Sequence, residues 1–304
     1  MHGSDLLSGL VVPVVTGLDE SGRPDVAASR PLLDALAGAG VTKLMVLGSN
    51  GEGPLLPTLG LDSYLSELIA EWRERVSGGI VVVNATAPGT AEALERGALA
   101  VAAGADAVVL CPPFYFFHRD DEIVEHYRRF ADIGAPVVGY NIPRYANPMT
   151  EAVIEQLAQL DHVVGVKDSS GDLATLQRFI AVKAARPGFG VSQGGETALL
   201  DGLKLHADGI VPGTSNLAPG LALDLFAAWR SGDLTAAQNA QDVTTELTAM
   251  HRIRPGVPSV KAVLHSLGLM TPHVAAPLAA CTDEELRLLT EFMEPYRAHL
   301  LDRG

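Results

Sequence analysis

Short runs of β-branched and apolar residues alternate with longer Ala- and Leu-rich stretches along residues 1–215. The short runs are apolar at nearly every position, which is typical of strands buried on both faces of a parallel sheet with helical crossovers. We predict eight strands, at 10–15, 43–47, 80–83, 106–110, 137–140, 163–166, 189–192 and 209–211. Seven helices are predicted between them, at 27–39, 60–76, 90–103, 120–133, 150–160, 172–185 and 196–206.

Eight strands joined by helices predict an α/β fold of the (β/α)8 TIM-barrel type. A doubly wound open sheet is the alternative, but no GxGxxG follows the first strand and no acidic residue stands where it would bind a ribose. Beyond residue 220 only helical periodicity continues. We therefore predict a barrel domain at 1–220 and a C-terminal helical extension at 221–304, which could cap the barrel or form an oligomer surface.

The excess of acidic over basic residues argues against binding to nucleic acids or to anionic membranes. The chain has 36 acidic and 22 basic residues, a formal net charge of -14, whereas nucleic acids and anionic membrane surfaces attract a basic face. No run approaches the roughly 18 apolar residues that a membrane span needs, and the N-terminus lacks a secretory signal. We expect a cytoplasmic protein that binds neither nucleic acid nor membrane, with Cys111 and Cys281 as free thiols.

Lys167 is the most informative single residue, because it directly follows the sixth strand. In a barrel of this type the carboxyl ends of the strands form the active site. A buried ammonium is costly there unless it is paired or neutralised. Desolvation lowers the pKa of a lysine, and a neutral amine can attack a carbonyl. The residues alone leave a structural ion pair with Asp168, or with another barrel carboxylate, equally open.

Polar groups also follow other predicted strands, but each of them is a weaker indicator of a particular chemistry than Lys167. Tyr140 ends the neighbouring strand, where its phenol could transfer protons or merely fill space and find a hydrogen-bond partner. The turn GSNGEG at 48–53 exposes backbone N–H groups that can bind a carboxylate, and it lacks the ending of a Walker loop. The loops at 193–196 and 212–216 could form the phosphate site of a barrel isomerase, although neither carries a cation.

Two other kinds of chemistry lack their usual motifs. The nine histidines include no HxH or HExxH, so we predict no metal site. No G-x-S-x-G elbow is present for a serine nucleophile. A mechanism in which the amine of Lys167 attacks a carbonyl needs no cofactor, so we expect none.

Five motifs occur in an order that resembles a known family: GSNGE at 48–52, PPFY at 112–115, YNIP at 140–143, GVKD at 165–168 and PGVPSVKAVLHSLGL at 255–269. Together they resemble the dihydrodipicolinate synthase / N-acetylneuraminate lyase family of class I aldolases, over nearly the whole chain. The resemblance implies a (β/α)8 barrel with a C-terminal helical domain, commonly assembled as a homotetramer. It also implies that pyruvate or another 2-keto acid binds as an imine to Lys167, with an aldehyde as the second substrate.

The resemblance further implies roles for individual residues. Tyr140 would be the general acid/base, and Ser49 and Tyr115 would complete a proton relay. In many members the residue at the position of Tyr115 comes from a neighbouring subunit. Substrate would be bound by Ser49, Asn50, Gly51, Gly194 and Val211.

The region of the second substrate departs from dihydrodipicolinate synthases. These enzymes carry an arginine two residues after the YNxP proline, where this chain has Tyr145, with Arg144 one place earlier. Arg144 and Tyr145 are therefore candidate contacts for a different aldehyde. The Ser-Asn and Lys-Asp-Ser sequences look more like the 4-hydroxy-2-oxoglutarate and 2-keto-3-deoxy-sugar-acid aldolases. A dihydrodipicolinate synthase, a keto-deoxy sugar acid dehydratase and a non-catalytic barrel used for sensing or scaffolding are the alternatives.

Overall fold

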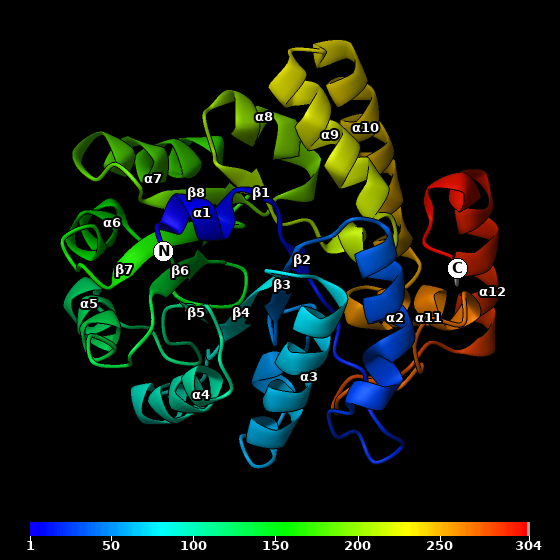
Figure 1. Cartoon of the computed structure of the whole chain (residues 1–304), viewed down its shortest axis with the longest axis horizontal. Coiled ribbons are helices and arrows are strands. Elements are labelled where there is room, and N and C mark those ends of the chain that lie inside the picture. The colour runs from blue at the N-terminus through cyan, green and yellow to red at the C-terminus, as the bar shows by residue number, and fades with distance from the viewer. Residues whose placement is uncertain (303–304) are drawn as a thin grey trace.

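The computed structural model describes residues 1–302 and contains one parallel sheet that closes into a barrel (Figure 1). The strands are β1 (Gly9–Leu10), β2 (Val12–Pro13), β3 (Lys43–Val46), β4 (Ile80–Asn84), β5 (Ala107–Leu110), β6 (Val137–Asn141), β7 (Val163–Asp168), β8 (Gly190–Gln193) and β9 (Gly209–Ile210). Their order, β1-β9-β8-β7-β6-β5-β4-β3-β2, follows the chain around the barrel. The predicted (β/α)8 fold is confirmed.

The predicted first strand, 10–15, consists of the two short segments β1 and β2. β1 pairs with β9 and β2 pairs with β3, all in parallel. The two segments thus share one position in the barrel and close it from both sides, which removes the exposed edges that an open sheet would have.

A ring of helices surrounds the sheet (Figure 1). It consists of α2 (Val26–Gly38), α3 (Leu61–Arg75), α4 (Thr90–Ala102), α5 (Asp120–Arg128), α6 (Glu151–Leu157), α7 (Leu173–Ala185), α8 (Leu199–Lys204) and α9 (Pro219–Ser231). Local signals start several of these helices: Asp172, for example, accepts hydrogen bonds from the N–H groups of Ala174 and Thr175 at the start of α7.

An unpredicted helix, α1 (Gly3–Leu7), packs against β7 and β8. A Cβ atom on Gly3 would lie 1.8 Å from the carbonyl oxygen of Val164, so only glycine allows this approach. Leu6 and Leu7 are fully buried and belong to the same hydrophobic cluster as Val11 and Val82. The helix therefore adds its leucines to the apolar filling of the barrel.

The chain ends in α10 (Leu234–Leu247), α11 (Val257–Ser266) and α12 (Asp283–Met293). α9 packs on β1, β9 and α10, while α11 and α12 lie on the α2 side of the barrel, away from α5 and α6 (Figure 1). The division of the chain at 220/221 stays a prediction. Within residues 1–302 no helix combines the length and apolarity required to cross a membrane.

Candidate active site

Lys167 and Tyr140 lie side by side at the carboxyl ends of β7 and β6. They are register partners in the two strands, and their side chains are 4% and 3% exposed. The Nζ atom of Lys167 lies 4.2 Å from the centre of the Tyr140 ring and 3.9 Å from Sδ of Met45. The lysine amine is therefore held among an aromatic face and a thioether, both weak partners for a charge.

Asp168 does not pair with Lys167. Its carboxylate accepts hydrogen bonds from Nδ2 of Asn141 at 2.7 Å and from Oγ of Ser170 at 2.9 Å. The strand continues through Asp168, so consecutive side chains point to opposite faces of the sheet. Burial raises the pKa of Asp168. Among residues 1–302 no carboxylate lies within ion-pair distance of Lys167, which removes the ion-pair interpretation for this part of the chain.

The glycine-rich turn brings Ser49 to the same place. Oγ of Ser49 and the hydroxyl of Tyr140 are 3.5 Å apart, a long hydrogen bond. A Cβ on Gly51 would lie 2.9 Å from the backbone nitrogen of Leu47, so the turn folds tightly over the end of β3. Lys167, Tyr140 and Ser49, predicted from three separate motifs, thus form one cluster.

The remaining substrate-binding candidates lie around this cluster. A Cβ on Gly194 would approach Cε of Lys167 to 2.8 Å, which places this backbone directly against the lysine. Val211 is buried in the same apolar cluster as Tyr140. Asn50 faces Gly213, since a Cβ there would lie 3.0 Å from its Nδ2. The turns after β3 and β9 therefore meet across the end of the barrel.

Tyr115, Tyr145 and Arg144 form a second, exposed group. Tyr115 is 85% exposed and has a φ of 80°, an uncommon conformation for a residue with a side chain. Tyr115 and Tyr145 line one surface hollow of about 200 Å³, and the guanidinium of Arg144 lies 5.5 Å from the centre of the Tyr145 ring. Within the described chain no hydrogen bond joins Tyr115 to Ser49 or Tyr140.

Two buried polar groups near Lys167 were not predicted as site residues. Ser192 is the register partner of Lys167 on β8 and is fully buried, and its hydroxyl has no hydrogen-bond partner among residues 1–302. Cys111 lies in the cluster with Tyr140, and burial raises its pKa to about 12, an effect that a hydrogen bond with Thr86 and the nearby Lys167 oppose. Side chains along a strand point alternately to its two faces, so Ser192 lies on the face opposite Val191 and Gln193. This alternation could have identified Ser192 as a candidate site residue from the sequence.

The loops after β8 and β9 show no arrangement suited to a phosphate. Oε1 of Glu196 accepts a hydrogen bond from the backbone N–H of Thr214 at 2.7 Å, and Oε2 of Glu196 lies close to Gly213. The carboxylate of Glu196 thus already accepts from a backbone N–H group of the kind that would bind a phosphate. Residues 1–302 contain no group of three or more His, Cys, Asp or Glu side chains arranged to hold a metal ion.

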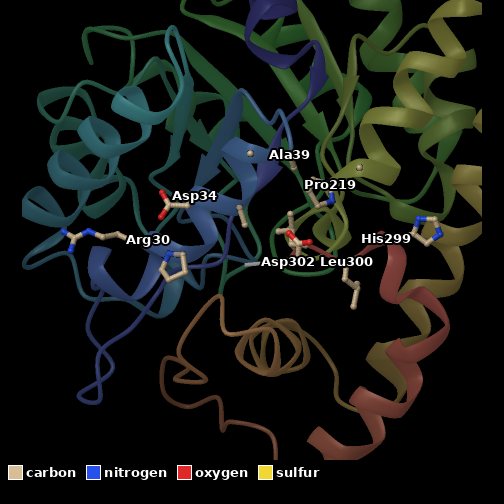
Figure 2. Close-up of a pocket in the computed structure, with 12 residues that line it drawn as sticks. Arg30, Asp34, Ala39, Pro219, His299, Leu300 and Asp302 are labelled. Carbon is tan, nitrogen blue, oxygen red and sulfur yellow. The ribbon is translucent and has the colours of Figure 1, made fainter. Parts of the chain in front are cut away.

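A groove of about 700 Å³ lies elsewhere, on the outside of the barrel. Figure 2 shows Arg30 and Asp34 on one side of this groove, and His299 and Leu300 of the C-terminal segment on the other. None of the predicted site residues lines it.

A barrel of this kind, followed by C-terminal helices, matches a family of lyases in comparison with known proteins. The chain belongs to the dihydrodipicolinate synthetase family, whose sequence profile matches residues 6–294.

Individual relatives span nearly the whole chain. A probable 2-dehydro-3-deoxy-D-pentonate aldolase of Escherichia coli, YjhH, is 30% identical, with 92% of this chain and 94% of the relative covered. A 4-hydroxy-tetrahydrodipicolinate synthase of Ralstonia nicotianae is also 30% identical, with 98% of each covered. The crystal structure of YagE from E. coli, in complex with pyruvate, superposes with a TM-score of 0.89 at 26% identity, covering 96% of this chain and 99% of YagE.

Proposed function

We propose that the protein is a class I lyase that binds pyruvate, or a 2-keto-3-deoxy acid, as an imine on Lys167. The observation that carries the proposal is the buried amine of Lys167, which has no acidic partner in the described chain and lies 4.2 Å from the ring of Tyr140. A desolvated amine is the nucleophile that carbonyl chemistry requires. The pyruvate complex of YagE, a structural relative, supports the pyruvyl half of the substrate.

The proposed reaction uses these groups one after another. The Lys167 amine adds to the keto carbon. Tyr140 then donates its phenolic proton to the departing hydroxyl of the carbinolamine, so that water leaves, the protonated imine forms and Tyr140 becomes the phenolate. Tyr140, as the phenolate, takes the proton of the C4 hydroxyl, the C3–C4 bond breaks, and the aldehyde leaves while the imine accepts the electron pair as an enamine. Tyr140 then returns the proton to C3, and water releases pyruvate from Lys167. The synthetic direction reverses these steps.

The carboxylate of the keto acid would bind at the turn that carries Ser49 and Asn50. This turn supplies two polar side chains and backbone N–H groups beside the lysine, and such turns bind anions. Gly194 and Val211 would form the walls on either side of the imine. Gly51 allows the turn to fold back on Leu47.

For the second substrate we propose the aldehyde of a 2-keto-3-deoxy sugar acid. Arg144 is exposed, and its guanidinium lies over the ring of Tyr145. Dihydrodipicolinate synthases carry an arginine at the position of Tyr145, whereas the arginine of this chain stands one residue earlier. The name of YjhH supports the same substrate class. Dihydrodipicolinate synthesis and dehydration of a keto-deoxy sugar acid are the two alternatives, and both use the same imine.

We also propose that the protein acts as a homotetramer in which Tyr115 completes the relay of a neighbouring subunit. Tyr115, Phe116 and Phe117 are 85%, 68% and 100% exposed. Exposed aromatic patches of this kind mark protein–protein contacts.

Borohydride trapping tests the proposed function. Incubation with pyruvate followed by reduction should yield a covalent adduct, detected by mass, in the wild type and in Lys183→Ala, whose lysine instead pairs with Asp208 at 2.6 Å. Lys167→Ala should give none. An adduct that persists in Lys167→Ala, or none in the wild type, would refute the mechanism.

A panel of aldehydes and keto-deoxy acids, assayed by pyruvate release, then separates the substrate alternatives. An adduct without turnover on any of them would indicate the non-catalytic barrel. Thermal stabilisation by sugar phosphates but not by pyruvate would indicate the isomerase.

A further inference from the structure

A fully buried ion pair connects the C-terminal extension to the glycine-rich turn. Lys261 on α11 pairs with Glu52, and both side chains are 0% exposed. The Nζ atom of Lys261 also donates a hydrogen bond to the carbonyl oxygen of His273 at 2.7 Å. Oε1 of Glu52 accepts a hydrogen bond from the N–H of Ala275 at 2.7 Å. One pair therefore joins three segments: α11, residues 273–275, and the turn beside the lysine of the candidate site.

Glu52 lies in a part of the turn that has little conformational freedom of its own. Leu47 and Glu52 have φ angles of 59° and 56°, and residues with side chains keep such angles only where their surroundings hold them. A Cβ on Gly53 would lie 1.8 Å from the carbonyl oxygen of Leu47. Ser49 and Asn50 lie between these two constrained positions, so the contacts of Glu52 bear directly on where their donors point.

A second cation holds the far side of the same segment. Arg96 on α4 is 5% exposed and donates to the carbonyl oxygens of Gly53 at 2.9 Å and Leu56 at 2.6 Å. The hydroxyl of Thr16 donates to the carbonyl oxygen of Gly51 at 2.7 Å. Each of these contacts uses a backbone oxygen, whereas Lys261 acts on the side chain of Glu52.

A buried ion pair is a costly way to add stability, because both ions lose their hydration. Burial lowers the pKa of Lys261, and the neighbouring carboxylate of Glu52 opposes that change. Hydrophobic side chains of the same size would pack α11 at lower cost. The pair is directional, however, and it sets the orientation of Glu52 in a way that apolar contacts cannot.

We propose that Lys261 and Glu52 are positioning residues that orient the Ser49–Asn50 turn for the carboxylate of the 2-keto acid, so that the C-terminal extension takes part in substrate binding. This inference rests on the proposed function. Neither side chain is exposed to the substrate, and both act through the turn. Their loss therefore weakens binding of the keto acid more than it slows the chemistry on Lys167.

The test compares Lys261→Met, Glu52→Gln and the double variant with the wild type. Borohydride trapping is measured against pyruvate concentration, which gives a half-saturating concentration and a limiting rate. We expect Lys261→Met to raise the half-saturating concentration at least tenfold and to change the limiting rate less than threefold. Glu52→Gln, which keeps an acceptor for Ala275, should show a smaller rise. If Lys261→Met does not fold, the double variant leaves no unpaired buried charge and should show the same rise.

The pair Lys183 and Asp208 provides the control. Lys183 lies 2.6 Å from Asp208, and Asp208 accepts a hydrogen bond from the N–H of Val191 at 2.8 Å, near the start of β8. Lys183→Met with Asp208→Asn should lower Tm without changing the half-saturating concentration. An equal rise in this control, or an unchanged value in Lys261→Met and the double variant, overturns the inference.

Hydrogen exchange separates a failure of this inference from a failure of the proposed function. Without substrate, amides 48–53, 55 and 56 should exchange at least tenfold faster in Lys261→Met than in the wild type, and unchanged exchange overturns the positioning role whatever the enzyme binds. Absence of trapping in the wild type overturns the imine chemistry, and with it the role in keto acid binding, even where exchange is faster.

Discussion

Replacement of Tyr140 by Phe removes one oxygen from the candidate site and leaves the rest of the side chain in place. The ring is 3% exposed and packs over Nζ of Lys167, so its packing is retained. The lost hydrogen bond to Ser49 is 3.5 Å long, and its loss should cost less than about 1 kcal/mol of stability. General acid–base catalysis contributes roughly 10²- to 10⁴-fold, so the turnover number should fall by that factor, about 3–5 kcal/mol of activation free energy.

Tyr127→Phe is the matched control. Tyr127 is also fully buried, and its hydroxyl donates to the carbonyl oxygen of Leu110 at 2.6 Å. Loss of that bond removes one donor from a carbonyl of β5, a strand that stays paired with β6, and should cost about 0.5–1.5 kcal/mol. The two variants should therefore show opposite patterns, with Tyr140→Phe stable and inactive and Tyr127→Phe active and less stable.

Aldehyde-dependent pyruvate release and urea unfolding measure the two quantities. Imine trapping on Tyr140→Phe should be slower than in the wild type but should reach the same final yield, because Lys167 is unchanged. A turnover number within tenfold of the wild type would show that Tyr140 is only a packing residue. An equal loss of activity in Tyr127→Phe would show that the effect is not specific to the site.

Two further changes test the surroundings of the site and the response to acid. Gly194→Ala should slow imine trapping at least tenfold, because its Cβ would lie 2.2 Å from Oγ of Ser169 and 2.8 Å from Cε of Lys167. Gly220→Ala, with no atom within 4 Å of the new Cβ, should trap normally, and normal trapping by Gly194→Ala would contradict the close approach of this backbone to Lys167. Burial lowers the pKa of His126 from 6.5 to about 4, so on acidification the unfolded chain binds the proton first and stability is lost below pH 6.5. Between pH 7.5 and 5 this histidine should account for a loss of about 2 kcal/mol in the free energy of unfolding, measured by denaturant titration, and an unchanged pH dependence in His126→Gln would disprove the assignment.

Much of the fold could be read from the sequence because each strand of a parallel barrel is buried on both faces. Such strands appear as short, continuous apolar runs, and the seven from 43 onward lie within a few residues of their predicted places. The position of Lys167 directly after one of these runs predicts that it lies at the carboxyl end of the barrel. The roles of Lys167, Tyr140, Ser49 and the other candidate residues stay predictions until the variants are measured.

Other features depended on contacts that no local pattern contains. The partner of Asp168 could not be predicted, because the strand runs two residues further than its apolar run and turns this carboxylate toward Asn141 instead of Lys167. α1 is too short to carry a periodic signal, and its place is set by the close approach of Gly3 to β7.

The ion pair between Lys261 and Glu52 also depends on a contact between residues that lie far apart in the sequence. The sequence by itself determined the barrel and the residues at the ends of its strands, because burial imposes a local pattern on each strand. Only the tertiary structure decided which charges meet, because residues far apart in the chain come together there, and an ion pair between them leaves no trace in the residues on either side.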